Sequence, residues 1–142
     1  MAELEFVRTF AAPVQLVWEA WTDPDQLARW WGPRKCRTLR ESIVLELRPG
    51  GRIAMTMVDD ATGESWSSSG RFLRVDPPSE LAWLDDKIVY GPGRATTTLT
   101  FAEDGDGNTV LRVRVVAEHV AEEAKLGWTS TLDRLAELVS VQ

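Results

Sequence analysis

Side chains that commonly carry chemistry are scarce in this sequence of 142 residues, which has one cysteine (Cys36), one histidine (His119) and one tyrosine (Tyr90). A single cysteine excludes a disulfide within the chain, and one cysteine with one histidine argues against a structural zinc site. A Ser-His-Asp triad would have to use His119, which precedes a long helical pattern and is expected at the surface. We therefore expect no metal site and no cofactor, and the sequence does not identify a catalytic residue.

Long apolar runs and positive charge are also lacking. No segment approaches the ~18 consecutive apolar residues of a membrane-spanning helix, and the first ten residues do not form a secretory signal. We therefore predict a cytoplasmic protein with no membrane span. The chain has 16 basic and 22 acidic residues, a net charge of −6, and one local basic cluster over 34–40. A groove that follows nucleic-acid phosphates needs clustered Lys and Arg, so a nucleic-acid partner is not expected.

Tryptophan, in contrast, is abundant. The seven are Trp18, Trp21, Trp30, Trp31, Trp66, Trp83 and Trp128. A buried aromatic ring hides ~150–250 Å², and large rigid rings form the walls of many ligand cavities. Two interpretations therefore stay open for each ring, which belongs either to an ordinary packed core or to the wall of a binding cavity.

The spacing of apolar residues predicts the order of the elements. A strand over 3–10 is followed by two short helices, the second beginning after Asp23 as N-cap and ending at Gly32-Pro33. Segments with a period of two then follow, at 39–47, 53–57, 66–75, 81–84, 95–101 and 110–117. A helical stripe over 120–139 closes the chain. The fold class is α+β, with an antiparallel sheet of six to seven strands and one domain over 1–142.

The long helix has a geometric consequence. About 20 residues at 1.5 Å each make a rod of roughly 30 Å, which crosses a whole sheet. If the sheet curves around such a helix, its concave side is wider than the helix alone fills. The remaining space becomes a pocket between sheet and helix.

Particular motifs in this pattern resemble a known family. They are "FAAPVQLVWEAWTDPDQLARWWGP", "LELRPGGRIAMTM", "SSSGRFLRVDPPSELAW", and a late "GW" followed by "LDRL". Together they resemble the homologues of the activator of the heat-shock-protein-ninety ATPase, in the START-like superfamily (SRPBCC), which also includes polyketide cyclases and pollen allergens. The resemblance implies a helix-grip fold, in which a curved antiparallel sheet surrounds a long C-terminal helix and encloses a hydrophobic cavity. It does not imply one activity, since relatives include lipid and polyketide binders, cyclases, self-sacrificing resistance proteins and co-chaperones.

The predicted cavity lining follows from the faces of these elements. Methionine adapts to irregular ligands as well as to irregular cores, and a serine between aromatic residues supplies one polar group. Trp30 is expected to point inward with Leu27, three positions before it, which leaves Trp31 either for the cavity mouth or for a subunit contact. Gly127 either brings the long helix close to the sheet or leaves room above it. The complete set is Trp30, Trp31, Met55, Met57, Trp66, Ser68, Phe72, Trp83, Leu99, Phe101, Trp128 and Leu132.

Ionisable residues offer few candidates for acid–base work. Glu41 lies in an apolar run and is expected at a solvated strand edge. Asp85 and Asp86 follow a short strand and are expected to be exposed. Cys36 has basic neighbours that favour a lowered pKa, or else it is an inert thiol at the start of a strand.

Three functional hypotheses result. The first is a protein that binds a hydrophobic, lipid- or polyketide-like molecule in an internal cavity. The second is a cyclase- or hydrolase-type enzyme using the same cavity, which ranks lower because inward-facing acids are few. The third is an interaction module, either a co-chaperone or a homodimer. A chaperone partner is not expected, because eukaryotic activators of this type carry an additional N-terminal domain.

Overall fold

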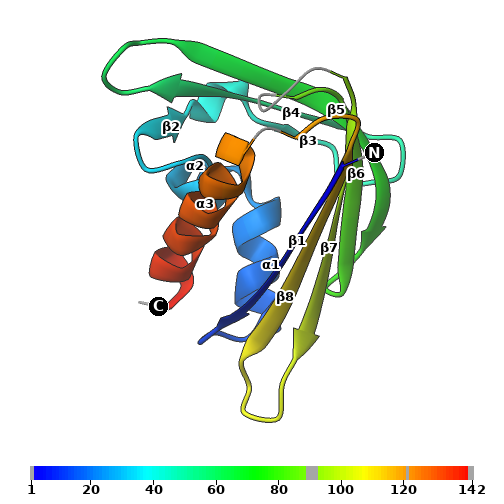
Figure 1. Cartoon of the computed structure of the whole chain (residues 1–142). Helices are drawn as coiled ribbons and strands as arrows, with labels where there is room; N and C mark the ends of the chain where they lie inside the picture. Colours follow the sequence, from blue (N-terminus) through cyan, green and yellow to red (C-terminus); the bar gives the residue numbers. More distant parts are fainter. Residues whose placement is uncertain (1, 89–92, 121, 141–142) are drawn as a thin grey trace.

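The computed structural model describes residues 2–88, 93–120 and 122–140 (Figure 1). The elements in chain order are β1 (Ala2–Phe10), α1 (Val14–Thr22), α2 (Pro24–Trp30), β2 (Cys36–Thr38), the 3-10 turn η1 (Arg40–Ser42), β3 (Val44–Leu45), β4 (Arg52–Asp59), β5 (Ser65–Asp76), β6 (Glu80–Lys87), β7 (Ala95–Glu103), β8 (Thr109–Ala117) and α3 (Glu122–Ser140). The order predicted from periodicity, with two short helices after the first strand and one long helix at the end, is confirmed.

The strands form one antiparallel sheet. Among the described residues the strand order is β1-β8-β7-β6-β5-β4-β2, with β3 pairing beside β2 on β4. The sheet is strongly curved, and the helices lie inside its curve (Figure 1). The α+β helix-grip architecture is therefore confirmed. Within the described segments, no helix is both long and apolar enough to cross a membrane.

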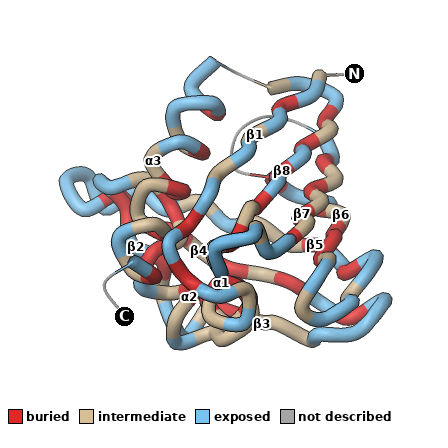
Figure 2. Tube along the Cα trace, turned by 90° about the horizontal axis from the view of Figure 1, so that it is seen from below, coloured by how far each residue is buried: buried red, intermediate tan, exposed pale blue. Residues whose placement is uncertain are grey.

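The core lies between the concave face of the sheet and α3. Along β8, Leu111, Val113 and Val115 are buried, whereas Arg112 and Arg114 between them are exposed. Figure 2 shows the same alternation of buried and exposed positions along the strands. The helix contributes a stripe at helical spacing, which consists of Ala124, Trp128, Thr131, Leu132, Leu135 and Val139. Full burial of a leucine side chain is worth ~1.5–3 kcal/mol, so these facing rows supply much of the stability.

One predicted strand is wrong. The segment 39–47 is not a single strand, because η1 separates β2 from β3. The Ser42 hydroxyl donates to the Leu39 carbonyl oxygen at 2.6 Å and accepts from the Thr56 backbone N–H at 2.9 Å. The side chain therefore takes a hydrogen bond that a ladder partner would otherwise make, and the backbone turns. Glu41, in this turn, is exposed as expected.

The short helix α2 begins and ends as its sequence indicates. Asp23 caps it by accepting the Asp25 backbone N–H at 3.0 Å, and Pro24 occupies its first turn. At its C-terminus, Arg134 of α3 donates to the Gly32 carbonyl oxygen at 2.9 Å and the Arg29 carbonyl oxygen at 3.1 Å. The same guanidinium lies within 3.4 Å of the carbonyl oxygens of Trp31, Pro33 and Cys36. A cation at a helix C-terminus is favourable, so Arg134 fixes the turn to α3.

Candidate functional site

A cleft of about 830 Å³ opens between the first half of α3, the turn after α2, and strands β4 and β5. Four large apolar side chains, those of Trp31, Met57, Trp66 and Trp128, form part of its wall. The complete lining is Trp31, Gly32, Pro33, Arg34, Lys35, Cys36, Met57, Trp66, Glu123, Ala124, Leu126, Gly127, Trp128, Ser130 and Thr131. Most of these residues are apolar, with Arg34, Lys35 and Glu123 as the charged members, and a mainly apolar lining is the usual character of a small-molecule site.

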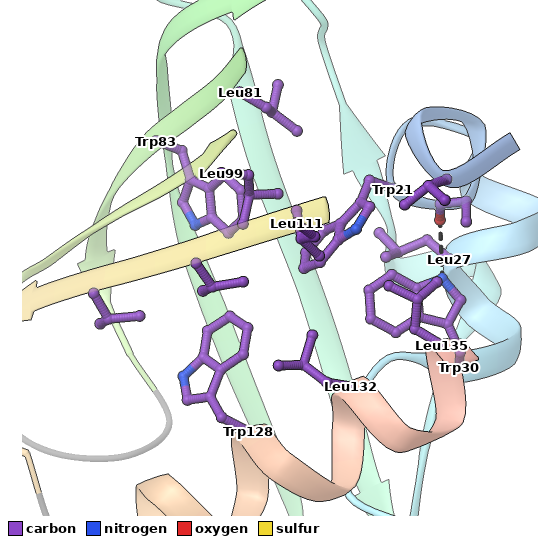
Figure 3. Packing of buried hydrophobic residues seen from close by; sticks show 14 of the residues in the cluster. Trp21, Leu27, Trp30, Leu81, Trp83, Leu99, Leu111, Trp128, Leu132 and Leu135 are labelled. Carbon is purple, nitrogen blue, oxygen red and sulfur yellow. Dashed lines mark hydrogen bonds between the residues drawn. The ribbon is translucent and has the colours of Figure 1, made fainter. Parts of the chain in front are cut away.

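The adjacent tryptophans Trp30 and Trp31 have different roles. Trp30 is completely buried, and its ring N–H donates to the Ala20 carbonyl oxygen at 2.9 Å (Figure 3). Trp31 is partly exposed and lies edge-to-face against Trp128, with ring centroids 5.6 Å apart. Trp21 packs edge-on against both rings of the pair. The inward orientation predicted for Trp30 is confirmed, and Trp31 is the ring that reaches the cleft.

Two glycines keep the cleft open. Gly32 has a φ of +97°, and a Cβ there would lie 2.8 Å from the Met57 sulfur atom. That backbone conformation strongly favours glycine. A Cβ at Gly127 would meet only the Pro33 ring, at 3.8 Å. Of the two interpretations offered for Gly127, the structure therefore supports the one in which it leaves room at the helix.

A second, smaller space of about 30 Å³, the inner cavity, adjoins this cleft on the side of the sheet. It shares Trp31, Met57, Trp66 and Trp128 with the cleft. Its other lining residues are Ile53, Met55, Ser68, Trp83, Asp85, Ile88 and Thr97. Figure 3 shows Trp128 projecting from α3 toward the sheet that carries Trp83, and both rings line this cavity.

Asp85 is the unexpected member of this cavity. The prediction that it is exposed is wrong, because only 8% of the residue is accessible. Strand β6 continues past Leu84 to Lys87, so the inward alternation of Leu81 and Trp83 extends to Asp85. The prediction for Asp86, which faces outward, is correct.

The Asp85 carboxyl group lies in a weakly polar environment. Its Oδ2 accepts the Trp83 ring N–H at 3.0 Å, and no ion pair to it is formed within the described ranges. Burial raises the pKa of Asp85 to about 7, which the Trp83 hydrogen bond opposes and the nearby Asp86 reinforces. Its neighbours across the sheet, Gly70 on β5 and Ala95 on β7, are small. Gly70 is required there, since a Cβ would lie 2.0 Å from the Leu84 carbonyl oxygen.

The predicted lining residues divide into two groups. Those on the cleft or the inner cavity are Trp31, Met55, Met57, Trp66, Ser68, Trp83 and Trp128. Those in the packed core, outside the lining of both spaces, are Trp30, Phe72, Leu99, Phe101 and Leu132. Asp85 and Thr97 were not among the predicted lining residues, although Asp85 continues the alternation of a predicted strand beyond its end and Thr97 lies between the apolar positions of another.

The remaining candidates lie at or beyond the rim. Arg34 forms an ion pair with Glu137 on α3. Cys36 is buried, and burial, followed by the negative charge of Asp59, raises the pKa of its thiol. This setting opposes the lowered pKa that its basic neighbours suggested. His119 is exposed, as expected, and Tyr90 lies outside the described residues.

The geometry defines a class, namely helix-grip proteins with a curved antiparallel sheet, a long C-terminal helix and a space between them. The family model described as "Activator of Hsp90 ATPase homolog 1-like protein" matches residues 11–140, and the chain belongs to this family. The family is consistent with the START-like superfamily expected from the sequence motifs.

Solved structures agree with this assignment. A protein from Chromobacterium violaceum is 28% identical with a TM-score of 0.86, covering 97% of this chain and 96% of its own. A protein from Mycobacterium smegmatis is 26% identical with a TM-score of 0.79, covering 99% and 91%. An AHSA1-like protein from Aeromonas hydrophila, 24% identical with a TM-score of 0.82 over 99% and 93%, shares the fold. No curated protein shows a significant match.

Proposed function

We propose that this protein binds a small, largely apolar molecule in the cleft between α3 and the sheet. The observation that carries the proposal is the cleft itself, of about 830 Å³, whose wall includes Trp31, Met57, Trp66 and Trp128. Cavities of this size and character hold most of the surface of a drug-sized ligand. A ligand with rings or an acyl chain matches flat aromatic faces and an adaptable methionine.

The aromatic wall is held in place before any ligand arrives. Trp31 packs edge-to-face on Trp30 at 5.6 Å and on Trp128 at 5.6 Å. The Trp128 ring in turn packs against Phe6 of β1, with ring centroids 6.2 Å apart. Rings fixed in this way lose little conformational entropy on binding, so more of the gain from apolar burial remains as affinity.

Blocking the cleft tests the proposal. Gly127→Leu places a side chain in the open mouth, where a Cβ has only the Pro33 ring nearby. Lys125→Leu adds the same side chain to an exposed position of α3 outside the lining. Tryptophan fluorescence would be titrated with fatty acids, flavonoids and polyketides. We expect saturable quenching in the wild type and in Lys125→Leu, and its loss in Gly127→Leu. Equal binding by both variants would place the ligand elsewhere.

A second candidate, an acid–base enzyme in the same cavity, is favoured by one observation. Asp85 is an inward-facing carboxyl group, and its pKa of about 7 means that donor and acceptor forms coexist at neutral pH. Such a group is suited to general acid or base catalysis. Bound ligands would be incubated with the wild type and with Asp85→Asn and recovered for mass spectrometry and NMR. Conversion only by the wild type supports an enzyme, whereas unchanged recovery supports a binding protein.

A further inference from the structure

The inner cavity is lined by polar side-chain atoms for which the described residues supply no hydrogen-bond partner. Neither Asp85 Oδ1, nor the Thr97 hydroxyl, nor the Ser68 hydroxyl makes a hydrogen bond to any described residue. Asp85 and Thr97 are only 8% and 1% accessible. Their polar atoms are nevertheless not sealed off, since the one side-chain nitrogen or oxygen with neither access nor a partner among the described residues is the Trp21 ring nitrogen. Both residues line the inner cavity, so we take that small access to be from this space. Buried polar groups without partners cost folding free energy and are uncommon.

Outside the cavity the Trp21 ring N–H also has no partner among the described residues, but the other buried threonine and aspartate side chains are all hydrogen-bonded. Thr38, Thr109 and Thr131 are buried too, and each donates its hydroxyl to a backbone carbonyl oxygen at 2.8–2.9 Å. Asp59 accepts backbone N–H groups of the following turn at 2.8 and 3.0 Å. Thr97 and Asp85 thus differ from their counterparts elsewhere in the described chain, and both line the same small space.

The size of that space limits what enters it. A volume of about 30 Å³ holds roughly one water-sized group. A ring or a branched chain does not fit, but a single oxygen substituent does. The body of such a molecule would lie against Trp31, Met57, Trp66 and Trp128, which form both this cavity and the outer cleft.

We propose that the inner cavity is a subsite for one hydroxyl group of a neutral ligand whose apolar body occupies the outer cleft, with Asp85 and Thr97 as its hydrogen-bond partners. This inference rests on the proposed binding function and narrows its ligand class. A hydroxyl group both donates and accepts, so it satisfies the carboxyl group and the threonine hydroxyl together. A ligand ending in a carboxylate would instead place a second acid beside Asp85 in a cavity with no basic lining residue.

The surrounding charges agree with a neutral ligand. The residues paired with Asp85 across the sheet, Gly70 and Ala95, carry no charge. Asp86 faces solvent and lies 3.7 Å from Arg94. The raised pKa of Asp85 adds support, because at neutral pH its carboxyl group offers both a donor and an acceptor form, and a hydroxyl group pairs with either.

The test uses naphthalene, naphthol and naphthoate, the last two substituted at the same ring position, in isothermal titration calorimetry. For the wild type we expect naphthol to bind roughly tenfold more tightly than naphthalene, as one hydrogen bond allows, and naphthoate most weakly. Thr97→Val keeps the shape of the side chain and removes its hydroxyl, and Asp85→Leu removes the carboxyl group. Both should reduce the preference for naphthol while naphthalene still binds. Asp86→Asn, outside the lining, should keep the preference.

The outcomes separate the subsite from the proposed function. If naphthol and naphthalene bind the wild type equally, or naphthoate binds best, the hydroxyl subsite is refuted and the apolar cleft stands. If none of the three compounds binds, the proposed function fails and the subsite fails with it. If Asp85→Leu does not fold, Thr97→Val decides alone, because valine and threonine have nearly the same shape. An unchanged preference in Thr97→Val refutes the subsite.

Discussion

Stability should depend on pH through Asp85, and Asp85→Asn isolates the effect. In the unfolded chain this carboxyl group has its ordinary pKa near 3.8, and in the folded protein it keeps its proton up to about 7. Between these two values the folded state binds one proton more than the unfolded state. Raising the pH therefore favours the unfolded state, and the contribution of Asp85 to stability falls across this window.

The magnitude follows from the two pKa values. A difference of about 3 pH units at ~1.4 kcal/mol each corresponds to about 4 kcal/mol. Below about pH 4 both states of the wild type carry the proton, and above about pH 7 both have lost it, so the effect is confined between these limits. Asparagine has a similar shape and no titration, so the variant lacks this term.

The assay is urea unfolding of the wild type and Asp85→Asn at a series of pH values. We expect the difference in unfolding free energy, Asp85→Asn minus wild type, to increase by about 4 kcal/mol as the pH rises from about 4 to 7. Above about pH 7 this difference should stay constant. Asp86→Asn removes an exposed carboxyl group from the next position and should follow the wild type closely. A constant difference between Asp85→Asn and wild type at all pH values would refute the burial of an uncompensated acid.

Three further outcomes are expected. Arg134→Ala should lower the free energy of unfolding by about 2–3 kcal/mol in urea, because it removes a charged donor from the carbonyl oxygens after α2; Arg134→Lys should recover only part, since one ammonium group cannot span them. Gly127→Ala should stabilise the protein by about 1 kcal/mol in calorimetry, because the helix gains a better former without a clash. Cys36 should react slowly with a thiol reagent near neutral pH and quickly after unfolding, since burial raises its pKa; rapid reaction in the folded state would contradict its burial.

Much of the fold was predictable because its elements have clear periods. Helix α3 and strand β8 each bury one face, so their apolar residues recur at the spacing of a helix and of a strand, and that spacing is visible in the sequence. The orientation of Trp30 followed from the same rule, since Leu27 lies three positions before it on one helical face. The break between β2 and β3 was not predictable from periodicity. It depends on a hydrogen bond between the Ser42 hydroxyl and the backbone N–H of Thr56 on β4, a residue distant in sequence.

The site was less predictable, and Asp85 shows why. An acid after an apolar run reads equally well as the end of a strand or as an inward position of a longer one. What decides is the length of the paired neighbours, and β5 and β7 provide partners for Asp85 at Gly70 and Ala95. Nothing local to β6 encodes those partners. Core and lining residues were also indistinguishable, since Phe72 and Met55 alternate inward in the same way.

The adjacent residues Trp30 and Trp31 link the packed core to the wall of the cleft. Trp30 is fixed by its hydrogen bond to the Ala20 carbonyl oxygen and by Trp21, whose ring centroid is 4.6 Å away. The Trp31 ring packs edge-to-face against the Trp30 ring and, on its other side, against the Trp128 ring of α3. Arg134 holds the backbone that follows, so the position of the cleft wall depends on the core and on α3 together. A change at Arg134 should therefore alter ligand affinity as well as stability, although its side chain does not line the cleft.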